Sequence, residues 1–239
     1  MRTREESAFR GEPTSSGATG PEFEAARHTR VERVPILDGW RATSILLVLS
    51  AHLIPLPPRV LQFNYTAGAM GMALFFTLSG FLITQFLIAG ISVGDFLARR
   101  LARIVPLCWS ALVILFLWHH YDAPTVARNF LFVANLPPVS LPTGGEHLWS
   151  LGVEMQFYIT VAMLCLIFGR RGLYLIPVIA IAVTSARIFA GERISIVTWH
   201  RVDEILAGGL IALIYSGWMG ERAKEMLKRL PVWPFAIAL

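Results

Sequence analysis

Long apolar stretches recur along this chain, and they constrain its fold more than any other feature. A helix that crosses the hydrocarbon core of a bilayer needs about 20 mostly apolar residues. Segments close to that length lie at 36–56, 67–90, 101–118, 148–168, 173–190 and 203–217. A shorter apolar segment lies at 126–136, and another begins at 231. The sequence therefore predicts an all-α, polytopic transmembrane bundle with about seven to eight spanning segments.

The composition divides the chain into two parts. Of the 239 residues 55% are hydrophobic and 15% are charged, with a mean hydropathy of +0.58, which is too apolar for an ordinary soluble domain. Residues 1–33 are instead rich in Arg, Glu, Ser, Thr and Gly, so they cannot bury enough apolar surface to offset their ordering entropy. We predict a disordered cytoplasmic tail at 1–33 and a transmembrane domain at 34–239. Because the segment after 231 is too short to cross, we expect this domain to be incomplete at its C-terminus.

The distribution of Lys and Arg predicts the orientation in the membrane. If the segment 126–136 does not cross, fifteen basic residues lie on one side of the bilayer and four on the other. Basic residues concentrate in cytoplasmic loops, so the N-terminus is predicted to be cytoplasmic and the 119–147 connection to be outside.

The sequence does not indicate a nucleic-acid partner, a disulfide framework or a metal site. The net charge is +5, but the basic residues gather at helix ends and form no stripe with interleaved aromatic residues, so we expect no nucleic acid. Cys108 and Cys165 lie inside apolar segments, where their spacing suggests neither a disulfide framework nor a metal site.

Three ionisable residues, Asp38, Arg41 and His52, lie in the first apolar segment. An ionisable side chain inside a spanning helix costs at least about 2.5–3.5 kcal/mol on insertion scales, so it suggests function. Arg41 and His52 are eleven residues apart. That spacing brings them to one helix face, about 16 Å apart along the axis, and Asp38 is close enough to pair with Arg41.

These residue types have both functional and structural interpretations. A neutral imidazole can accept a proton from an attacking hydroxyl, and a buried guanidinium can hold a phosphate or carboxylate. His52 could instead hydrogen-bond to neighbouring helices, and Arg41 could be a topological anchor. Their shared face favours the functional interpretation.

A second group of arginines, Arg99, Arg100 and Arg103, precedes the third long apolar segment at helical spacing. Such a group could bind the phosphates of a nucleotide-bearing donor. The alternative is that these residues only set the topology.

The segment HLWSLGVEMQFYI places Ser150, Glu154 and Tyr158 on one helical face, with Trp149 beside them. A carboxylate within an apolar helix needs a partner, and we expect His52, Arg41 or Arg201 to supply it, unless Glu154 forms an ion pair that only fixes helix register. The segment WHRVDEILAGGL begins the last complete predicted helix and contains Arg201, Asp203 and Glu204, which could line an outer vestibule or belong to an interfacial loop.

Taken together, these segments resemble the acyltransferase 3 family of membrane-bound O-acyltransferases that modify bacterial surface polysaccharides. The resemblance rests on LDGWRATSILLVLSAH, which has arginine, ten residues and histidine, and on FFTLSGFLIT, RRLARIVP, WSLGVEMQFY and RVDEILAGG. In the last motif Ile205 replaces the usual aromatic residue. The five motifs occur in the family's order between residues 35 and about 210.

The resemblance implies transfer of an acetyl or other short acyl group from acyl-CoA to a hydroxyl of a saccharide or lipid-linked saccharide. His52 would be the catalytic base, with Glu154 and Arg41 in the active centre. Donor and acceptor would contact a larger set: Arg99, Arg100, Arg103, Asp38, Trp149, Ser150, Tyr158, Arg201 and Glu204. Acyl-CoA would be a substrate, with no bound cofactor or metal, and the protein would lie in a bacterial inner membrane.

Two alternatives compete with this hypothesis. A transporter would also place charges and glycines within the bilayer, although the sequence contains no visible inverted repeat. The second alternative is a non-catalytic membrane fragment, which is favoured because the chain ends within an apolar segment.

Overall fold

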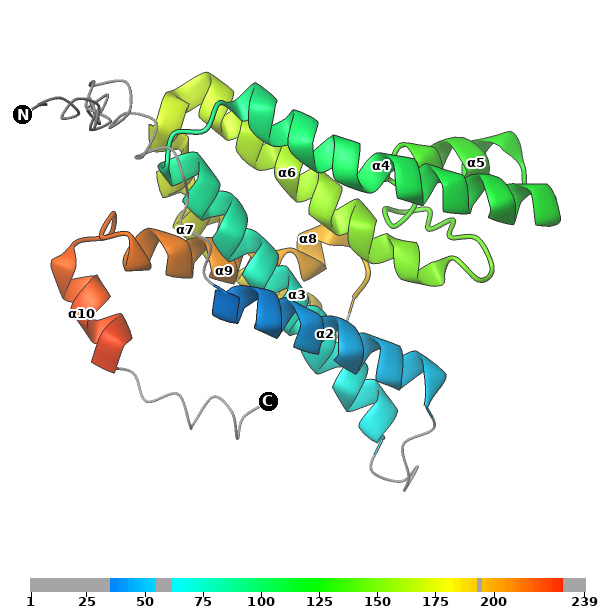
Figure 1. Cartoon of the computed structure of the whole chain (residues 1–239), viewed down its shortest axis with the longest axis horizontal. Coiled ribbons are helices and arrows are strands. Elements are labelled where there is room, and N and C mark those ends of the chain that lie inside the picture. Colours follow the sequence, from blue (N-terminus) through cyan, green and yellow to red (C-terminus); the bar gives the residue numbers. More distant parts are fainter. Residues whose placement is uncertain (1–34, 55–61, 193–194, 230–239) are drawn as a thin grey trace, which may run out of the picture. The chain divides into compact units, whose positions relative to one another are not determined.

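The fold consists of helices joined by turns and loops. The computed structural model describes residues 35–54, 62–192 and 195–229, and it contains no strand in those ranges (Figure 1). In chain order its helices are α2 (Pro35–Leu53), α3 (Phe63–Ile88), α4 (Val93–Trp118), α5 (Ala123–Phe130), η2 (Glu146–Leu148), α6 (Trp149–Phe168), η3 (Gly169–Tyr174), α7 (Leu175–Ala190), α8 (Thr198–Arg201), α9 (Asp203–Tyr215) and α10 (Glu221–Arg229). The predicted tail at 1–33 and the apolar segment after 231 lie outside the described residues.

Three helical stretches in the described part are long and apolar enough to cross a bilayer. They are α3, α4 and Glu146–Ala190, and the last contains α6 and α7 joined by η3. The all-helical, membrane-type fold is therefore confirmed, whereas seven to eight spans are not. The helix α9 has 13 residues, about 20 Å of helix, against a hydrocarbon core of about 30 Å. The segment predicted not to cross contains the eight-residue α5, which is also too short to span.

The helices α2 and α3 form an antiparallel pair. The Asn64 side-chain amide, in the first turn of α3, donates hydrogen bonds to the carbonyls of Ala51 (2.9 Å) and Ile54 (2.6 Å) at the end of α2. These carbonyls accept no hydrogen bond from within the helix, so the Asn64 side chain caps the C-terminal end of α2. Further along, a Cβ on Gly71 would lie 2.8 Å from the Ser44 carbonyl oxygen. A glycine is therefore needed where the two backbones approach.

The closest helix approach is between α3 and α9. A Cβ added to Gly80 would overlap the carbonyl oxygen of Ile205, and a Cβ added to Gly208 would overlap that of Thr77. Small residues allow such contact between membrane helices, because without side chains the backbones pack directly. This contact fixes the start of α9, with its charged residues, against the middle of α3.

The helix α6 lies beside α4 (Figure 1). The two run in opposite directions, because Phe96 near the start of α4 contacts Tyr158, while Leu112 near its end lines a small pocket with Gly152. The chain then reverses at η3, and α7 returns to pack on α9. These contacts bring α2, α4, α6 and α9 together around the buried middle of α3.

Polar side chains tie two loops to α6. The Gln156 amide donates to Asn135 (2.9 Å), and Gln156 accepts from the Thr198 hydroxyl (2.6 Å). Asn135 in turn donates to Thr198 (2.8 Å). Because all three side chains are satisfied by one another, the loop after α5 and the start of α8 are fixed to the same face of α6.

Candidate functional site

Glu154 is a buried carboxylate in the second turn of α6. Only 3% of the residue is exposed, and Tyr158, one helical turn later, donates its hydroxyl to the Glu154 carboxylate. Tyr158 is itself 1% exposed. A buried carboxylate without a donor would be strongly destabilising, so this hydrogen bond is what allows Glu154 to lie there. The sequence predicted a shared helix face for Glu154 and Tyr158 and expected His52, Arg41 or Arg201 as the partner of Glu154, whereas the structure gives Tyr158 as its hydrogen-bond partner.

Arg100 reaches the same place from α4. Its guanidinium lies 5.7 Å from the ring centroid of Tyr158 and also over two phenylalanine rings, Phe86 at 5.6 Å and Phe96 at 6.0 Å. Aromatic faces stabilise a cation in a weakly solvated site. The three rings come from α3, α4 and α6, so the cage exists only when these helices pack.

Arg41 approaches from α2. Its guanidinium lies 5.8 Å from the ring centroid of Phe75, and it is near enough to Tyr158 for its charge to act on that hydroxyl, as the charge of Arg100 does. The structure therefore brings together Arg41, Arg100, Glu154 and Tyr158, which we call the Glu154 site. It contains two guanidinium groups and one carboxylate, with no ion pair between them among the described residues, so its formal charge is positive.

Other residues predicted to belong to this site lie apart from it. Arg99 and Arg103 are exposed on α4, so only Arg100 of the three turns toward α6. Asp38 is exposed and forms no ion pair with Arg41 among the described residues. Ser150 donates to the backbone of His147 at 3.0 Å. Helical spacing alone placed these residues correctly on their helices but did not show which faces are turned inward.

His52 lies at the far end of α2 and is exposed. Its turn is level with Asn64 at the start of α3, whereas Trp149 at the start of α6 contacts Phe76, at 5.9 Å between ring centroids. Asn64 and Phe76 are twelve residues apart, or about 18 Å along α3. The predicted contact between His52 and Glu154 is therefore not among the contacts of the described residues.

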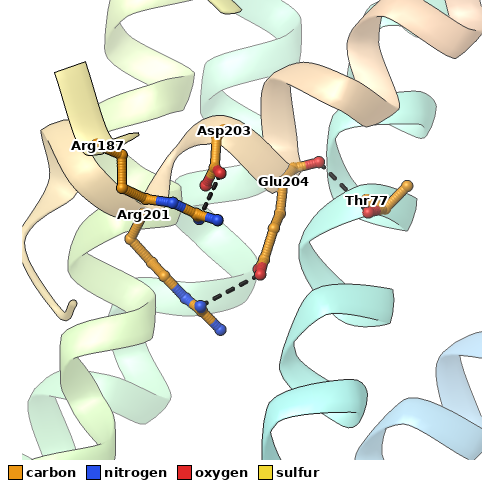
Figure 2. Close-up of polar contacts among 5 residues, drawn as sticks. All are labelled: Thr77, Arg187, Arg201, Asp203 and Glu204. Carbon is orange, nitrogen blue, oxygen red and sulfur yellow. Dashed lines mark hydrogen bonds and ion pairs between the residues drawn. The ribbon is translucent and has the colours of Figure 1, made fainter. Parts of the chain in front are cut away.

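A second polar group gathers at the start of α9 (Figure 2). Arg187 of α7 forms an ion pair with Asp203 at 2.5 Å, and Arg201 of α8 forms one with Glu204 at 3.2 Å. We call these four residues the charge cluster. The Thr77 hydroxyl of α3 donates to the Glu204 carbonyl at 3.3 Å.

Trp149 links the charge cluster to α6. The Arg201 guanidinium lies 5.7 Å from the ring centroid of Trp149, and the Arg201 side chain is only 6% exposed. Arg201, Glu204 and Trp149, which were predicted separately, are thus neighbours. Arg201 is paired with Glu204 and not with Glu154 among the described ion pairs.

Sequence reasoning missed Arg187 and Thr77. Arg187 lies in the last turn of α7, inside the predicted apolar segment 173–190, so the cost of an intramembrane charge should have singled it out. Thr77 carries no such signal, because its role depends on the contact with a helix 127 residues away.

Comparison with known proteins gives the family. The family model described as "Acyltransferase domain", Acyl_transf_3, matches residues 34–239. The chain belongs to the acyltransferase 3 family. The resemblance inferred from the five motifs is confirmed, and four of the motifs contribute residues to the Glu154 site or the charge cluster.

Curated relatives of this acyltransferase 3 chain are named for O-acetylation. The peptidoglycan O-acetyltransferase OatA of Listeria monocytogenes is 28% identical over 169 residues, which cover 59% of this chain and 26% of OatA. YrhL of Bacillus subtilis, provisionally named a peptidoglycan O-acetyltransferase, is 30% identical over 53% of this chain and 23% of YrhL. The chain thus spans about a quarter of the length of these relatives. No solved structure matches it significantly.

The structure of this family member allows a direct test of the Tyr158 contact. Changing Tyr158 to phenylalanine leaves the buried Glu154 carboxylate without its donor, so we expect the free energy of unfolding to fall by about 1–3 kcal/mol. The measurement is denaturant unfolding of the purified protein in detergent.

The control is Tyr65→Phe, which removes an exposed hydroxyl and should change stability by no more than about 0.5 kcal/mol. Equal stability of the two variants would show that Glu154 does not depend on Tyr158.

Proposed function

We propose that this chain is an integral membrane O-acyltransferase. It moves an acetyl or other short acyl group from acyl-CoA to a hydroxyl of a saccharide or similar cell-envelope acceptor. The observation that carries the proposal is the Glu154 site, where Arg100 of α4 lies over Tyr158, the hydrogen-bond partner of the buried Glu154 carboxylate, and Arg41 of α2 lies over Phe75. Family membership and the names of the relatives support the same activity.

In this proposal the arginines hold the donor. Acyl-CoA carries several phosphates, and guanidinium groups bind phosphate through paired, charge-assisted hydrogen bonds. One carboxylate cannot neutralise Arg41 and Arg100 together, so an anionic ligand would balance the charge of the site. Arg99 and Arg103, exposed on the same helix, would meet the donor before it reaches Arg100.

His52 is proposed as the general base. Its imidazole takes the proton from an acceptor hydroxyl, the oxygen attacks the thioester carbonyl, and coenzyme A leaves as the thiol after gaining a proton. Two features support this role: His52 shares the continuous helix α2 with Arg41, and its exposed ring is accessible to a substrate. Glu154 would act from the donor side and not by direct contact with His52.

The proposed setting is a bacterial inner membrane, with the N-terminus in the cytoplasm. Acyl-CoA is cytoplasmic, and the excess of basic residues assigned to that side fits delivery of an anionic donor from there. The acceptor would be reached from within the membrane or from the outer face.

The test is transfer of a labelled acetyl group from acetyl-CoA to a saccharide by the purified chain in detergent. Detergent removes compartments, so a transporter gives no product there, whereas an enzyme does. A non-catalytic fragment would bind no thioester while remaining folded. Absence of transfer, with acetyl-CoA bound, would contradict the proposal.

Replacing Arg100 with glutamine is expected to weaken acetyl-CoA binding by about tenfold to a hundredfold. A hydrogen bond to a charged group contributes about 1.5–3 kcal/mol, and Arg100 is the arginine held in the aromatic cage. Equilibrium binding of labelled acetyl-CoA measures the effect. Arg222→Gln, on the exposed side of α10, serves as the control and should bind as the wild type does. Unchanged acetyl-CoA binding by the Arg100 variant would show that Arg100 is not part of the donor site.

A further inference from the structure

The helix α10 is too short and too polar to cross a bilayer. Six of its nine residues, ERAKEMLKR, are charged, and none of the nine is buried. Between α9 and α10 the chain passes through Gly217 and Gly220, which have φ angles of 77° and 91°, so the two helices do not form one continuous segment (Figure 1). A helix of this length is marginal in water by itself, so α10 needs a surface that covers its apolar residues.

The charged residues of α10 are arranged in order around an apolar sector. At about 100° per residue, this sector covers about 100° of the helix and contains Ala223, Met226 and Leu227. Met226 is 69% exposed. Arg222 and Arg229 lie at the border of the sector, within about 60° of Met226, whereas the two glutamates lie on the opposite side of the helix. The acidic groups are therefore the ones farthest from the apolar side chains.

The ion pairs of α10 concentrate its net charge at the same border. The two lysines each pair with a glutamate: Lys224 with Glu221 at 3.8 Å and Lys228 with Glu225 at 2.8 Å. Arg222 and Arg229 form no ion pair within the part of the chain that the structure describes. An apolar sector bordered by cationic side chains is the arrangement of a helix that lies in the membrane interface, with its apolar side chains toward the acyl chains and its cations among the headgroups.

A contact with η3 places the start of α10 at the level where α6 ends and the chain turns back into α7. Tyr174 of η3 packs against Trp218 in the turn before α10, with 5.3 Å between ring centroids, and its hydroxyl donates to the Trp218 carbonyl at 3.5 Å. A short connection between two apolar helices lies at the bilayer surface, where Trp and Tyr are enriched. The same connection contributes Arg170 and Arg171, which are exposed and form no ion pair among the described residues.

We infer that α10 lies on the membrane surface and binds anionic phospholipid headgroups, with Met226 and Leu227 toward the acyl chains and Arg222 and Arg229 on the lipid phosphates. The distribution of Lys and Arg along the sequence predicts that this side is cytoplasmic, and anionic lipid in that leaflet attracts basic residues next to spanning helices. A water-soluble anion would make no use of the apolar sector, which favours the lipid. The inference does not depend on the proposed acyl transfer.

The experiment measures hydrogen exchange of the α10 amides by mass spectrometry, with the whole chain in lipid nanodiscs. One set of nanodiscs contains phosphatidylcholine alone, and the other contains an equal mixture with the anionic phosphatidylglycerol. Each Lys or Arg close to an anionic surface strengthens binding by about fivefold, so we expect exchange in the mixture to be slower by about tenfold or more. Protection arises because the surface-bound helix opens less often.

Two neighbouring variants separate lipid binding from the internal stability of the helix. Arg229→Gln removes a charge at the border of the apolar sector and should lose about fivefold of the protection given by phosphatidylglycerol. Lys228→Gln removes the same charge from the opposite side and is the matched control, with an expected loss of about twofold at most. If only ion pairs held α10, the order would be reversed, because Lys228 pairs with Glu225 and Arg229 does not pair among the described residues. Met226→Gln, which keeps helix propensity, should lower protection in both lipids.

Three results would overturn the inference. They are equal exchange by the wild-type chain in the two lipids, a loss in Lys228→Gln as large as that in Arg229→Gln, and full protection in an uncharged detergent without lipid. The last result would mean that another protein surface covers α10. Slower exchange with phosphatidylglycerol that depends on Arg229 and Met226 supports the inference, whether or not the chain transfers acyl groups.

Discussion

Purified protein with His52 changed to alanine is expected to transfer acyl groups about 10²–10⁴ times more slowly than the wild type, the usual contribution of a general base. Without the imidazole, the acceptor hydroxyl must lose its proton to water. Binding of acetyl-CoA should not change, because Arg41 and Arg100 lie about three turns and more away from His52 along α2 and α3. The measurement is the initial rate of labelled acetyl transfer at saturating donor.

Because His52 is exposed, we expect its replacement to lower the transfer rate without changing the stability of the protein. No hydrogen bond or ion pair of His52 occurs in the described ranges, so its removal should leave the unfolding temperature unchanged. His120→Ala removes another exposed histidine, in the connection after α4, and should transfer normally. A His52 variant with the wild-type rate would eliminate the imidazole as base.

Replacing Gly208 with alanine is expected to destabilise the protein strongly. Changing it to alanine adds a Cβ that overlaps the carbonyl oxygen of Thr77, so α9 must move away from α3. Overpacking a tight contact costs typically about 1–3 kcal/mol and sometimes more, and here the obstacle is rigid backbone. We expect a loss at or above the top of that range, measured by denaturant unfolding in detergent.

Gly94→Ala is the matched control, because a Cβ there meets no atom within 4 Å. Alanine is favoured over glycine in an exposed helix by about 1 kcal/mol, so this variant should be as stable as the wild type or more stable. If both alanine variants behaved alike, the close contact between α3 and α9 would be refuted. Since this contact positions Glu204, the Gly208 variant should also disturb the charge cluster.

The helices themselves were largely predictable from the sequence, because apolar length is a local property. The segment expected at 148–168 is observed as Trp149–Phe168, and that expected at 173–190 as Leu175–Ala190. The start of α4 was missed by eight residues. Its first two turns contain Gly94, Asp95 and Arg99, which look polar, but Ser92 caps the helix by accepting from the Asp95 backbone at 3.0 Å.

The site was predictable only in part, because its contacts join helices that are far apart in sequence. The spacing from Glu154 to Tyr158 gave a true contact, since both lie on one helix. Which arginine of α4 turns inward depends instead on packing against α3 and α6, and the same is true of the pairing between Arg187 and Asp203. Local spacing contains no information about such partners.

The central claim is tested most directly by mass spectrometry of the product formed when the purified chain is incubated with labelled acetyl-CoA and a saccharide in detergent. The account predicts a labelled acetyl ester on a saccharide hydroxyl, formed by the wild type and nearly absent with His52→Ala. Label that stays on coenzyme A, or that is released as free acetate at the same rate with and without saccharide, would contradict it.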